Sequence, residues 1–473
     1  METKRLLAYA TGLCGQNMTY FFISGWLFYY LEHILRISSR VVGNITAVSR
    51  AWDAVNDPLI GGLVDKHKFK NGEKLRPLLL YTPVFIGIIS AGMFMPSRLI
   101  SGMSSTAMIT VVCVFYLLWD VFYSFQDTAL WGMVAVSSPD SAERARVSQW
   151  VSIGAGAGGV IAGLFPSVRG MIIAGDEGGK TDLWVFFGAA IVLGLGGELI
   201  SMLAHKMKEA VESPRNEESL LKAIFVLRHN KKLLLISLAR FFKDSTQSLL
   251  PAVYFFESRQ NYNFGFVTLD PGTTQLVWGA LTGAVGAVAM LFVTRLSEKV
   301  GGMKKILVIA KIFSICARTL CFFIGFNTPA QIFAVMGIMA ISNIPTNMQD
   351  IAHRSLTSDS IDEVEYKTGE RTEGISFSMQ NFISKIATAV SLFFNGQILH
   401  KLGHDSNVKN YQQNSTYMKW QWPIFILGPA IGEILYLIVI MFIRDNKEER
   451  LRIEAELRER RKALEEKLGE AVV

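Results

Sequence analysis

Long apolar runs alternate with short polar stretches along most of this chain of 473 residues. The runs approach or exceed the about 20 residues that an α-helix needs to cross the hydrocarbon core of a bilayer. The pattern predicts twelve membrane-spanning helices, six before the polar stretch 205–232 and six after it. They lie near residues 6–33, 41–64, 77–96, 104–135, 148–172, 182–204, 233–256, 273–296, 304–326, 329–351, 374–400 and 421–444.

This arrangement predicts an all-α polytopic membrane protein built from two pseudo-symmetric six-helix bundles around a central cavity. The first bundle is expected to cover 1–204 and the second 233–444, with a cytoplasmic central loop at 205–232. The remaining segment, 445–473, interleaves charges with leucines at helical spacing. It is expected to form a charged cytoplasmic helix outside the membrane.

The composition supports a membrane protein, since 50% of the residues are hydrophobic and only 18% are charged. A soluble protein usually carries more charge. The net charge of +7 does not indicate nucleic-acid binding, because the basic residues gather in alternate loops, as the positive-inside rule predicts. By that rule both termini are cytoplasmic. The four cysteines lie in apolar runs and are expected to be small buried side chains, not metal ligands.

The stretch 49–62 falls inside the second predicted span, yet it holds two carboxylates. Asp53 and Asp57 are four residues apart, so on a helix they share one face. Charges inside a bilayer are costly and usually functional. We therefore expect a monovalent cation or a proton to be bound between these carboxylates. The alternative is that Arg50 neutralises Asp53 three residues away and that the group only holds helices together.

In the fourth predicted span, Asp120, Ser124 and Asp127 recur at helical spacing and form one stripe. Trp131 lies one turn beyond Asp127. A carboxylate beside an aromatic face suits a sugar, because the acid accepts hydroxyl hydrogen bonds and the ring packs on the apolar face. The alternative is that Trp131 is an ordinary core residue.

Other spans also contain polar side chains. Gln16 and Asn17 in the first span either face a polar cavity or bond to neighbouring helices. Lys385 in the eleventh span needs a carboxylate partner, as a structural ion pair or as part of a gate. Lys311 is expected near the cytoplasmic end of its span, with its ammonium group at the membrane surface.

Four stretches resemble motifs of the glycoside–pentoside–hexuronide:cation symporter family, within the major facilitator superfamily. They are RAWDAVNDP at 50–58, GEKLRP at 72–77, DTALW at 127–131 and YKTGERTEG at 366–374, with Lys385 eleven residues further on. The similarity covers nearly the whole chain and is strongest in the first half and around 362–390.

The resemblance implies a twelve-helix secondary transporter of the major facilitator fold, which works by alternating access and is not an enzyme. It would carry a sugar or glycoside with Na⁺, Li⁺ or H⁺, need no cofactor, and work as a monomer in a bacterial plasma membrane. The cation ligands implied are Asp53, Asn56, Asp57, Ser124 and Asp127. The solute contacts implied are Gln16, Asn17, Asp127, Trp131 and Lys385. Arg50, Arg371 and Lys385 would act in gating or between the bundles.

Two departures from the family pattern concern the solute. Asn17 stands where family sugar transporters often carry an aspartate, and the stretch 148–152 lacks their arginine early in span five. An amide still donates and accepts hydrogen bonds, but the fixed charge is lost. A non-sugar solute, such as a lipid-like molecule, therefore stays open.

A membrane sensor that binds a solute without moving it is a further alternative. An enzyme is disfavoured because the histidines lie mostly at span ends or in loops and form no catalytic set with serine and aspartate. A primary pump is disfavoured because the sequence has no nucleotide-binding loop of the Walker type.

Overall fold

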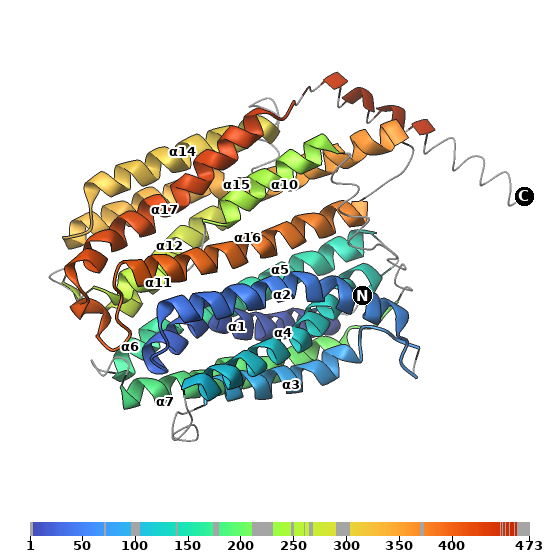
Figure 1. Ribbon diagram of the computed structural model, residues 1–473. Helices are drawn as coiled ribbons and strands as arrows, with labels where there is room; N and C mark the ends of the chain where they lie inside the picture. The colour runs from blue at the N-terminus through green and yellow to red at the C-terminus, as the bar shows by residue number, and fades with distance from the viewer. Residues whose placement is uncertain are drawn as a thin grey trace, which may run out of the picture. The chain divides into compact units, whose positions relative to one another are not determined.

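The computed structural model places the backbone of most of the chain (Figure 1). It describes residues 3–70, 72–95, 105–138, 141–173, 179–210, 230–246, 250–259, 261–263, 268–289, 303–368, 373–444, 446, 448–449, 451–453, 455–457 and 459–460. By its internal contacts the chain divides into two compact units. Unit 1 comprises residues 1–217, 248–280 and 388–425, and unit 2 comprises 218–247, 281–387 and 426–473.

The elements are almost all helices, as the apolar runs predict. They are α1 (Thr3–Tyr29), η1 (Tyr30–Ile34), α2 (Ser39–Lys66), α3 (Leu78–Met93), α4 (Ser105–Val136), α5 (Ser141–Gly163), α6 (Phe165–Ile173), α7 (Lys180–Ala189), η2 (Ala190–Leu195), α8 (Gly196–Ser201), η3 (Met202–Lys206), α10 (Lys231–Asp244), α11 (Leu250–Glu257), α12 (Pro271–Ala289), α14 (Met303–Ile324), α15 (Pro329–Thr368), α16 (Glu373–Lys401), η5 (Asn410–Gln412) and α17 (Ser415–Met441). One short antiparallel pair, β1 (Tyr262–Asn263) and β2 (Thr268–Leu269), lies in unit 1.

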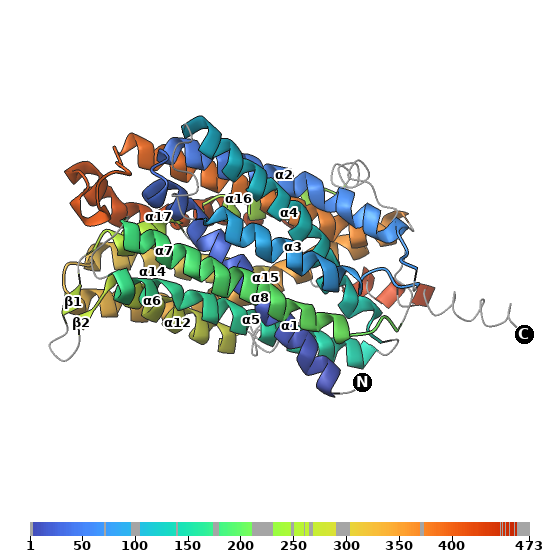
Figure 2. The same cartoon turned by 90° about the horizontal axis from the view of Figure 1, so that it is seen from below.

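In unit 1, α1 packs against α5 and α8, which are distant in sequence (Figure 2). Small residues make this packing close. A Cβ atom built on Gly158 of α5 would overlap the carbonyl oxygen of Cys14, and one on Gly15 of α1 would overlap that of Gly197. Such stripes of small residues let helix backbones approach within a membrane. This packing fixes which face of α1, and so which polar side chains, points at α4.

In unit 2, α14 packs against α15, and α10 also contacts α15. Their contact includes a buried apolar cluster, with Leu307 from α14, Leu356 from α15 and Ala239 from α10. Tyr436 of α17 belongs to the same cluster. The helices of unit 2 are therefore held by ordinary apolar packing around a few polar groups described below.

Seven helices or joined helices in the described residues are long and apolar enough to cross a membrane. They are Ile109–Val134, Arg146–Ile173, Lys180–Lys206, Met303–Ile324, Pro329–Thr346, Met379–Lys401 and Ser415–Met441. The predicted all-α polytopic fold is confirmed, while the count of twelve spans stays a prediction. The second predicted span, α2, has the necessary length but carries Arg50, Asp53 and Asp57.

Several predicted boundaries differ from the structure. The predicted span at 329–351 is part of one helix that continues to Thr368, because no residue after 351 breaks the helix. The predicted span at 233–256 is two helices, α10 and α11. Most of the predicted central loop, 211–229, lies outside the described residues. The cysteines are free thiols, and only Cys321 is buried, so expecting all of them to be buried was wrong.

Replacing Gly158 by valine should lower the stability of the folded protein by about 1–3 kcal/mol, because the new side chain forces α1 and α5 apart. The measurement is thermal unfolding of the purified protein in detergent. Gly156→Val is the matched control, since a Cβ atom there meets nothing within 4 Å. Equal melting temperatures for the two variants would contradict the close contact at Gly158.

Candidate functional site

The helices α2 and α4 contact each other in unit 1 and carry most of the predicted cation ligands. The hydroxyl group of Ser124 donates to Oδ1 of Asp57 at 2.8 Å. The side-chain amide of Asn56 donates to the oxygen of Ser124 at 3.4 Å. Asn56 and Ser124 are buried and Asp57 is half-buried. The structure thus brings together three residues that the sequence nominated from two separate helices.

The second carboxylate of α2 is engaged differently. Arg50 lies 3.7 Å from Oδ2 of Asp53, measured from Nη1, and both side chains are largely buried. Its Nη2 atom also donates to Ser24 of α1 at 3.0 Å. The ion pair that the sequence analysis raised as an alternative is therefore present. It separates the roles of the two aspartates, since Asp53 meets a guanidinium group and Asp57 meets a hydroxyl group.

The predicted solute contacts meet at Asp127 of α4. Its Oδ1 atom accepts a hydrogen bond from Nε2 of Gln16 at 3.0 Å and one from the indole N–H of Trp131 at 3.1 Å. Gln16 also donates to the hydroxyl group of Tyr123 at 2.6 Å. Asn17 donates to Oε1 of Gln16 at 2.8 Å. Gln16, Asn17, Asp127 and Trp131 therefore form one polar group between α1 and α4.

Aromatic rings lie beside this polar group. Trp131 is 49% exposed, so its ring face is available to another molecule. Tyr123 stacks on Trp119 at 4.6 Å and on Tyr20 at 5.5 Å between ring centroids. The sequence analysis did not assign Tyr123 to the site. Tyr123 lies one residue before Ser124, outside the stripe of the sequence analysis. Helical spacing did not reveal its contact with Gln16, which comes from α1.

The chemistry of these groups suits two kinds of ligand. Carboxylate, amide and hydroxyl oxygens are hard ligands. They suit cations that need no thiolate or imidazole ligand. The carboxylate of Asp127 and the exposed ring of Trp131 offer a hydrogen-bond acceptor beside an apolar face. Ser124 and Asp127 are three residues apart on α4, so the two groups share one face of that helix.

The two remaining candidates are outside this group. Lys385 is half-buried on α16, in unit 2. Its neighbour Ser384 donates to Oδ2 of Asp244 at 2.6 Å. Asp244 also pairs with Arg240 at 3.3 Å, four residues earlier, as the spacing predicts. Arg371 lies outside the described residues, so its gating role stays a prediction.

Glu198 and Glu433 are among the buried carboxylates that the sequence analysis missed. Glu198 of α8 is 0% exposed and accepts from Nε2 of Gln126 at 2.5 Å. Glu433 of α17 is also 0% exposed and lies 3.5 Å from the ammonium group of Lys311. In the sequence, Glu198 and Glu433 each stand as a single acidic residue inside an apolar run. That pattern was the available signal for a buried carboxylate.

Glu433 also corrects the expectation for Lys311. Lys311 is fully buried inside the protein, with its ammonium group beside Glu433. The Nε atom of Arg318 lies 3.6 Å from the same carboxylate. A buried cation is stabilised by an opposite charge, and here the partner comes from a helix more than a hundred residues away.

Apolar helices long enough to span a bilayer, with polar side chains grouped inside them, define a polytopic integral membrane protein. That it is a transporter and not an enzyme follows from its family. The chain belongs to the MFS/sugar transport protein family, whose sequence profile matches residues 8–447. The predicted membership of a sugar symporter family of the major facilitator type is confirmed.

Individual relatives are distant but cover most of the chain. An uncharacterized symporter of Bacillus subtilis, YjmB, is 25% identical over 94% of this chain and 92% of its own length. A putative glycoside/cation symporter of Escherichia coli, YagG, is 26% identical over 80% of this chain and 79% of its own. The lactose permease of Lactobacillus delbrueckii is 25% identical over 82% of this chain, which spans 61% of the length of that permease.

Solved structures support the fold. A crystal structure of the nucleoside transporter NupG matches with a TM-score of 0.59 and 14% identity, covering 94% of this chain and all of that one. A bacterial homolog of the human lysosomal transporter Spinster, in an inward-facing conformation, matches with a TM-score of 0.62 and 14% identity, over 93% of this chain and 98% of that one. At these identities the likeness concerns the fold alone.

Replacing Glu433 by glutamine should destabilise the protein by about 3–5 kcal/mol, because it leaves Lys311 and Arg318 buried without their shared carboxylate. Unfolding of the purified protein in detergent measures the effect. Glu363→Gln is the control, since Glu363 pairs with a lysine that is 63% exposed and should change stability by no more than about 0.5 kcal/mol. Similar losses in both variants would argue against a buried charge cluster.

Proposed function

We propose that this protein is a secondary active transporter that moves a sugar or glycoside together with Na⁺, Li⁺ or H⁺ by alternating access. The observation that carries the proposal is the pair of polar groups on one face of α4, one around Ser124 and one around Asp127. A helix that contacts both ligands can transmit the binding of one to the other. Thermodynamic linkage then makes the coupling reciprocal.

The cation is proposed to bind at Asp57, Asn56 and Ser124, with Asp53 and Asp127 completing the set. Support comes from the 2.8 Å contact between Ser124 and Asp57, which already joins two helices through oxygen ligands. A cation there would neutralise the acidic charge that burial in a membrane penalises. Arg50 is paired with Asp53. A movement of α1 and α2 that makes or breaks this pair would therefore change how tightly the site holds the cation.

The solute is proposed to contact Asp127, Trp131, Gln16 and Asn17. The exposed ring of Trp131 and the Oδ1 atom of Asp127 support this placement. Lys385 and Arg371 are proposed to act between two six-helix bundles, 1–204 and 233–444, as the solute site opens to alternate sides. By the distribution of basic residues, both termini would be cytoplasmic in a bacterial plasma membrane, with the protein working as a monomer.

A non-sugar solute, such as a lipid-like molecule, is the second candidate, and two observations favour it. The amide of Asn17 is engaged inside the protein, donating to Leu13 at 3.0 Å and to Gln16 at 2.8 Å. Gln149, in the stretch where family sugar transporters carry an arginine, is uncharged and exposed. Fewer charged groups are then left to bind sugar hydroxyls. The solute panel in the experiment below therefore includes lysolipids.

The test is solute-driven ion uptake into proteoliposomes, in which each candidate solute is added with Na⁺, Li⁺ or a pH indicator. The wild-type protein should take up one ion in response to one class of solute. Asp53→Cys and Asp57→Cys should each abolish this uptake, because the cation loses a charged ligand, while the protein stays folded. Glu363→Gln is the control and should keep normal uptake.

Normal coupled uptake in both aspartate variants would contradict the proposed cation site. Binding of a solute by the wild-type protein without any accumulation would identify a membrane sensor instead. Uptake driven only by lysolipids would establish the second candidate.

Replacing Trp131 by alanine should weaken solute binding by about 1–3 kcal/mol, because the solute loses the apolar face of the indole ring. Equilibrium binding of the solute found above measures the change. Trp184→Ala removes a similarly exposed indole, 47% against 49%, and should leave the affinity unchanged. An unchanged affinity for Trp131→Ala would make Trp131 a packing residue.

A further inference from the structure

A group of ionisable side chains lies at the far end of α1, away from the proposed transport site. Glu32 and His33 belong to η1, a π-helical turn that continues α1. His404 follows α16, where Gly403 adopts φ +74°. A left-handed glycine ends a helix and turns the chain sharply. The turn brings His404 to Glu32, more than 370 positions away in the sequence but in the same unit.

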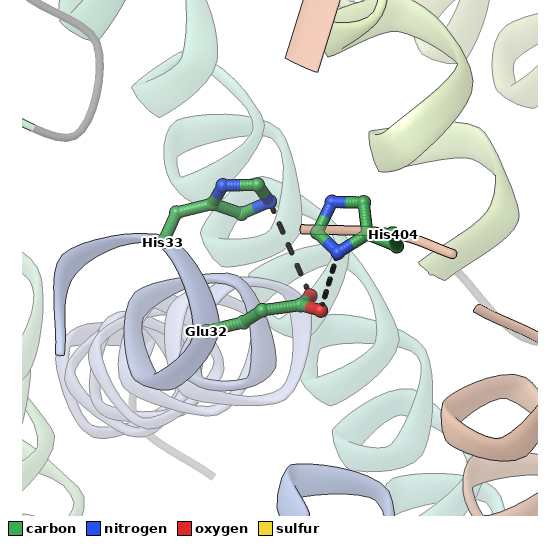
Figure 3. A group of neighbouring side chains, drawn as sticks. All are labelled: Glu32, His33 and His404. Carbon is green, nitrogen blue, oxygen red and sulfur yellow. Dashed lines mark ion pairs between the residues drawn. The ribbon is translucent and has the colours of Figure 1, made fainter. Parts of the chain in front are cut away.

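The three side chains converge on one point (Figure 3). The Nδ1 atom of His404 is 2.7 Å from Oε1 of Glu32. The Nε2 atom of His33 is directed at the same carboxylate, 4.0 Å from Oε2. One ligand atom from each residue lies within 4.8 Å of the others, and all three residues are buried. Convergence of this kind fits a ligand smaller than a side chain.

The Nε2 atom of His33 is the second, independent sign of a ligand. It is buried and has no hydrogen-bond partner in the described part of the chain. Buried polar nitrogens are nearly always bonded, and an exception calls for an explanation such as an ion. Glu32, by contrast, also accepts hydrogen bonds from Ser39 and Tyr254. These two hydroxyl groups would orient the carboxylate as outer partners of a metal site.

We propose that Glu32, His33 and His404 bind a divalent transition metal ion, and that their ligand set selects Zn²⁺. Two imidazole nitrogens and one carboxylate oxygen, with a water molecule in the fourth position, are a common zinc set. Zn–N and Zn–O bonds of about 2.0–2.2 Å place tetrahedral ligands about 3.4 Å apart. The 2.7 Å contact between His404 and Glu32 must therefore open by about 0.7 Å, and the 4.0 Å separation between His33 and Glu32 must close by about 0.6 Å.

The charges around the group accept a cation. Arg169 lies 4.8 Å from the centre of the Tyr29 ring, which stacks on His33. Arg169 is held by two carboxylates, Asp182 at 2.7 Å and Glu257 at 2.8 Å. Its positive charge is thus more than balanced. Arg36 is the other nearby cation, and it donates to the backbone carbonyl of Ser406. The three carboxylates Glu32, Asp182 and Glu257 still outnumber the two guanidinium groups.

A metal ion here would act on transport, and this step depends on the proposed function. It would tie the end of α1 to the segment after α16, and through Glu32 also to Tyr254 of α11. By the charge distribution this end faces the outside. Alternating access requires it to open, so Zn²⁺ added outside should hold the end closed and slow solute uptake.

The first experiment measures Zn²⁺ binding by titration calorimetry on the full chain, purified with a tag that lacks histidine. We expect one site per chain, weakened at least about tenfold in His33→Ala and in His404→Ala. His400→Ala is the control, because His400 is exposed and lies four residues before His404; it should bind as the wild type does. Equal binding in all four proteins, or no stoichiometric site, overturns the proposal.

Two measurements guard against misfolded variants. Glu32→Gln keeps an oxygen that accepts from Ser39 and Tyr254 but loses the charge, so it should fold and bind Zn²⁺ more weakly. X-ray absorption of the zinc-loaded wild-type protein should show imidazole scattering from two histidines. Oxygen ligands alone would overturn the site without any substitution.

The last experiment adds Zn²⁺ outside proteoliposomes during solute uptake. Inhibition of the wild-type protein, reversed by a chelator and absent in His404→Ala, would support the regulatory role. Zn²⁺ binding without inhibition would overturn that role and leave the metal site standing. An absence of any solute uptake would count against the proposed function, while the calorimetry still decides the metal site.

Discussion

Carboxylates inside apolar helices must find partners, and this constraint organises much of the structure. Ser124 donates to Asp57, Gln126 donates to Glu198, and Lys311 lies against Glu433. Each contact joins two helices that apolar packing alone would leave free to slide or rotate. Because an unpartnered charge in this environment costs several kcal/mol, these few contacts set how α2, α4 and α8, and separately α14 and α17, face one another.

Helix α4 contributes both to these carboxylate contacts and to the proposed transport site. One face of it presents Ser124 to Asp57 and, three residues later, Asp127 to Gln16. Close packing of glycines between α1, α5 and α8 holds Gln16 at that face. In the proposed symport a cation and a solute would therefore share side chains on one rigid helix. Coupling then needs only a small movement of α1 or α2 against α4.

Helix α1 connects this site with the proposed metal site. Gln16 and Glu32 are sixteen residues apart, which corresponds to about 24 Å along a helix. An ion that fixes Glu32 to His404 would restrain the same helix whose other residues contact Asp127. Both proposals thus involve α1, but they assign different residues to their ligands. Either proposal can be wrong while the other holds.

The sequence by itself determined the helical membrane fold, because apolar runs of spanning length admit few other structures. Helical spacing also suggested the pair of Arg50 with Asp53, which the sequence analysis gave as the alternative to a cation site. The tertiary structure alone decided that Asp127 meets Gln16, that Lys311 is buried against Glu433, and that His404 reaches Glu32. These partners are more than a hundred residues apart, and spacing within one helix carries no information about which face of another helix it will meet.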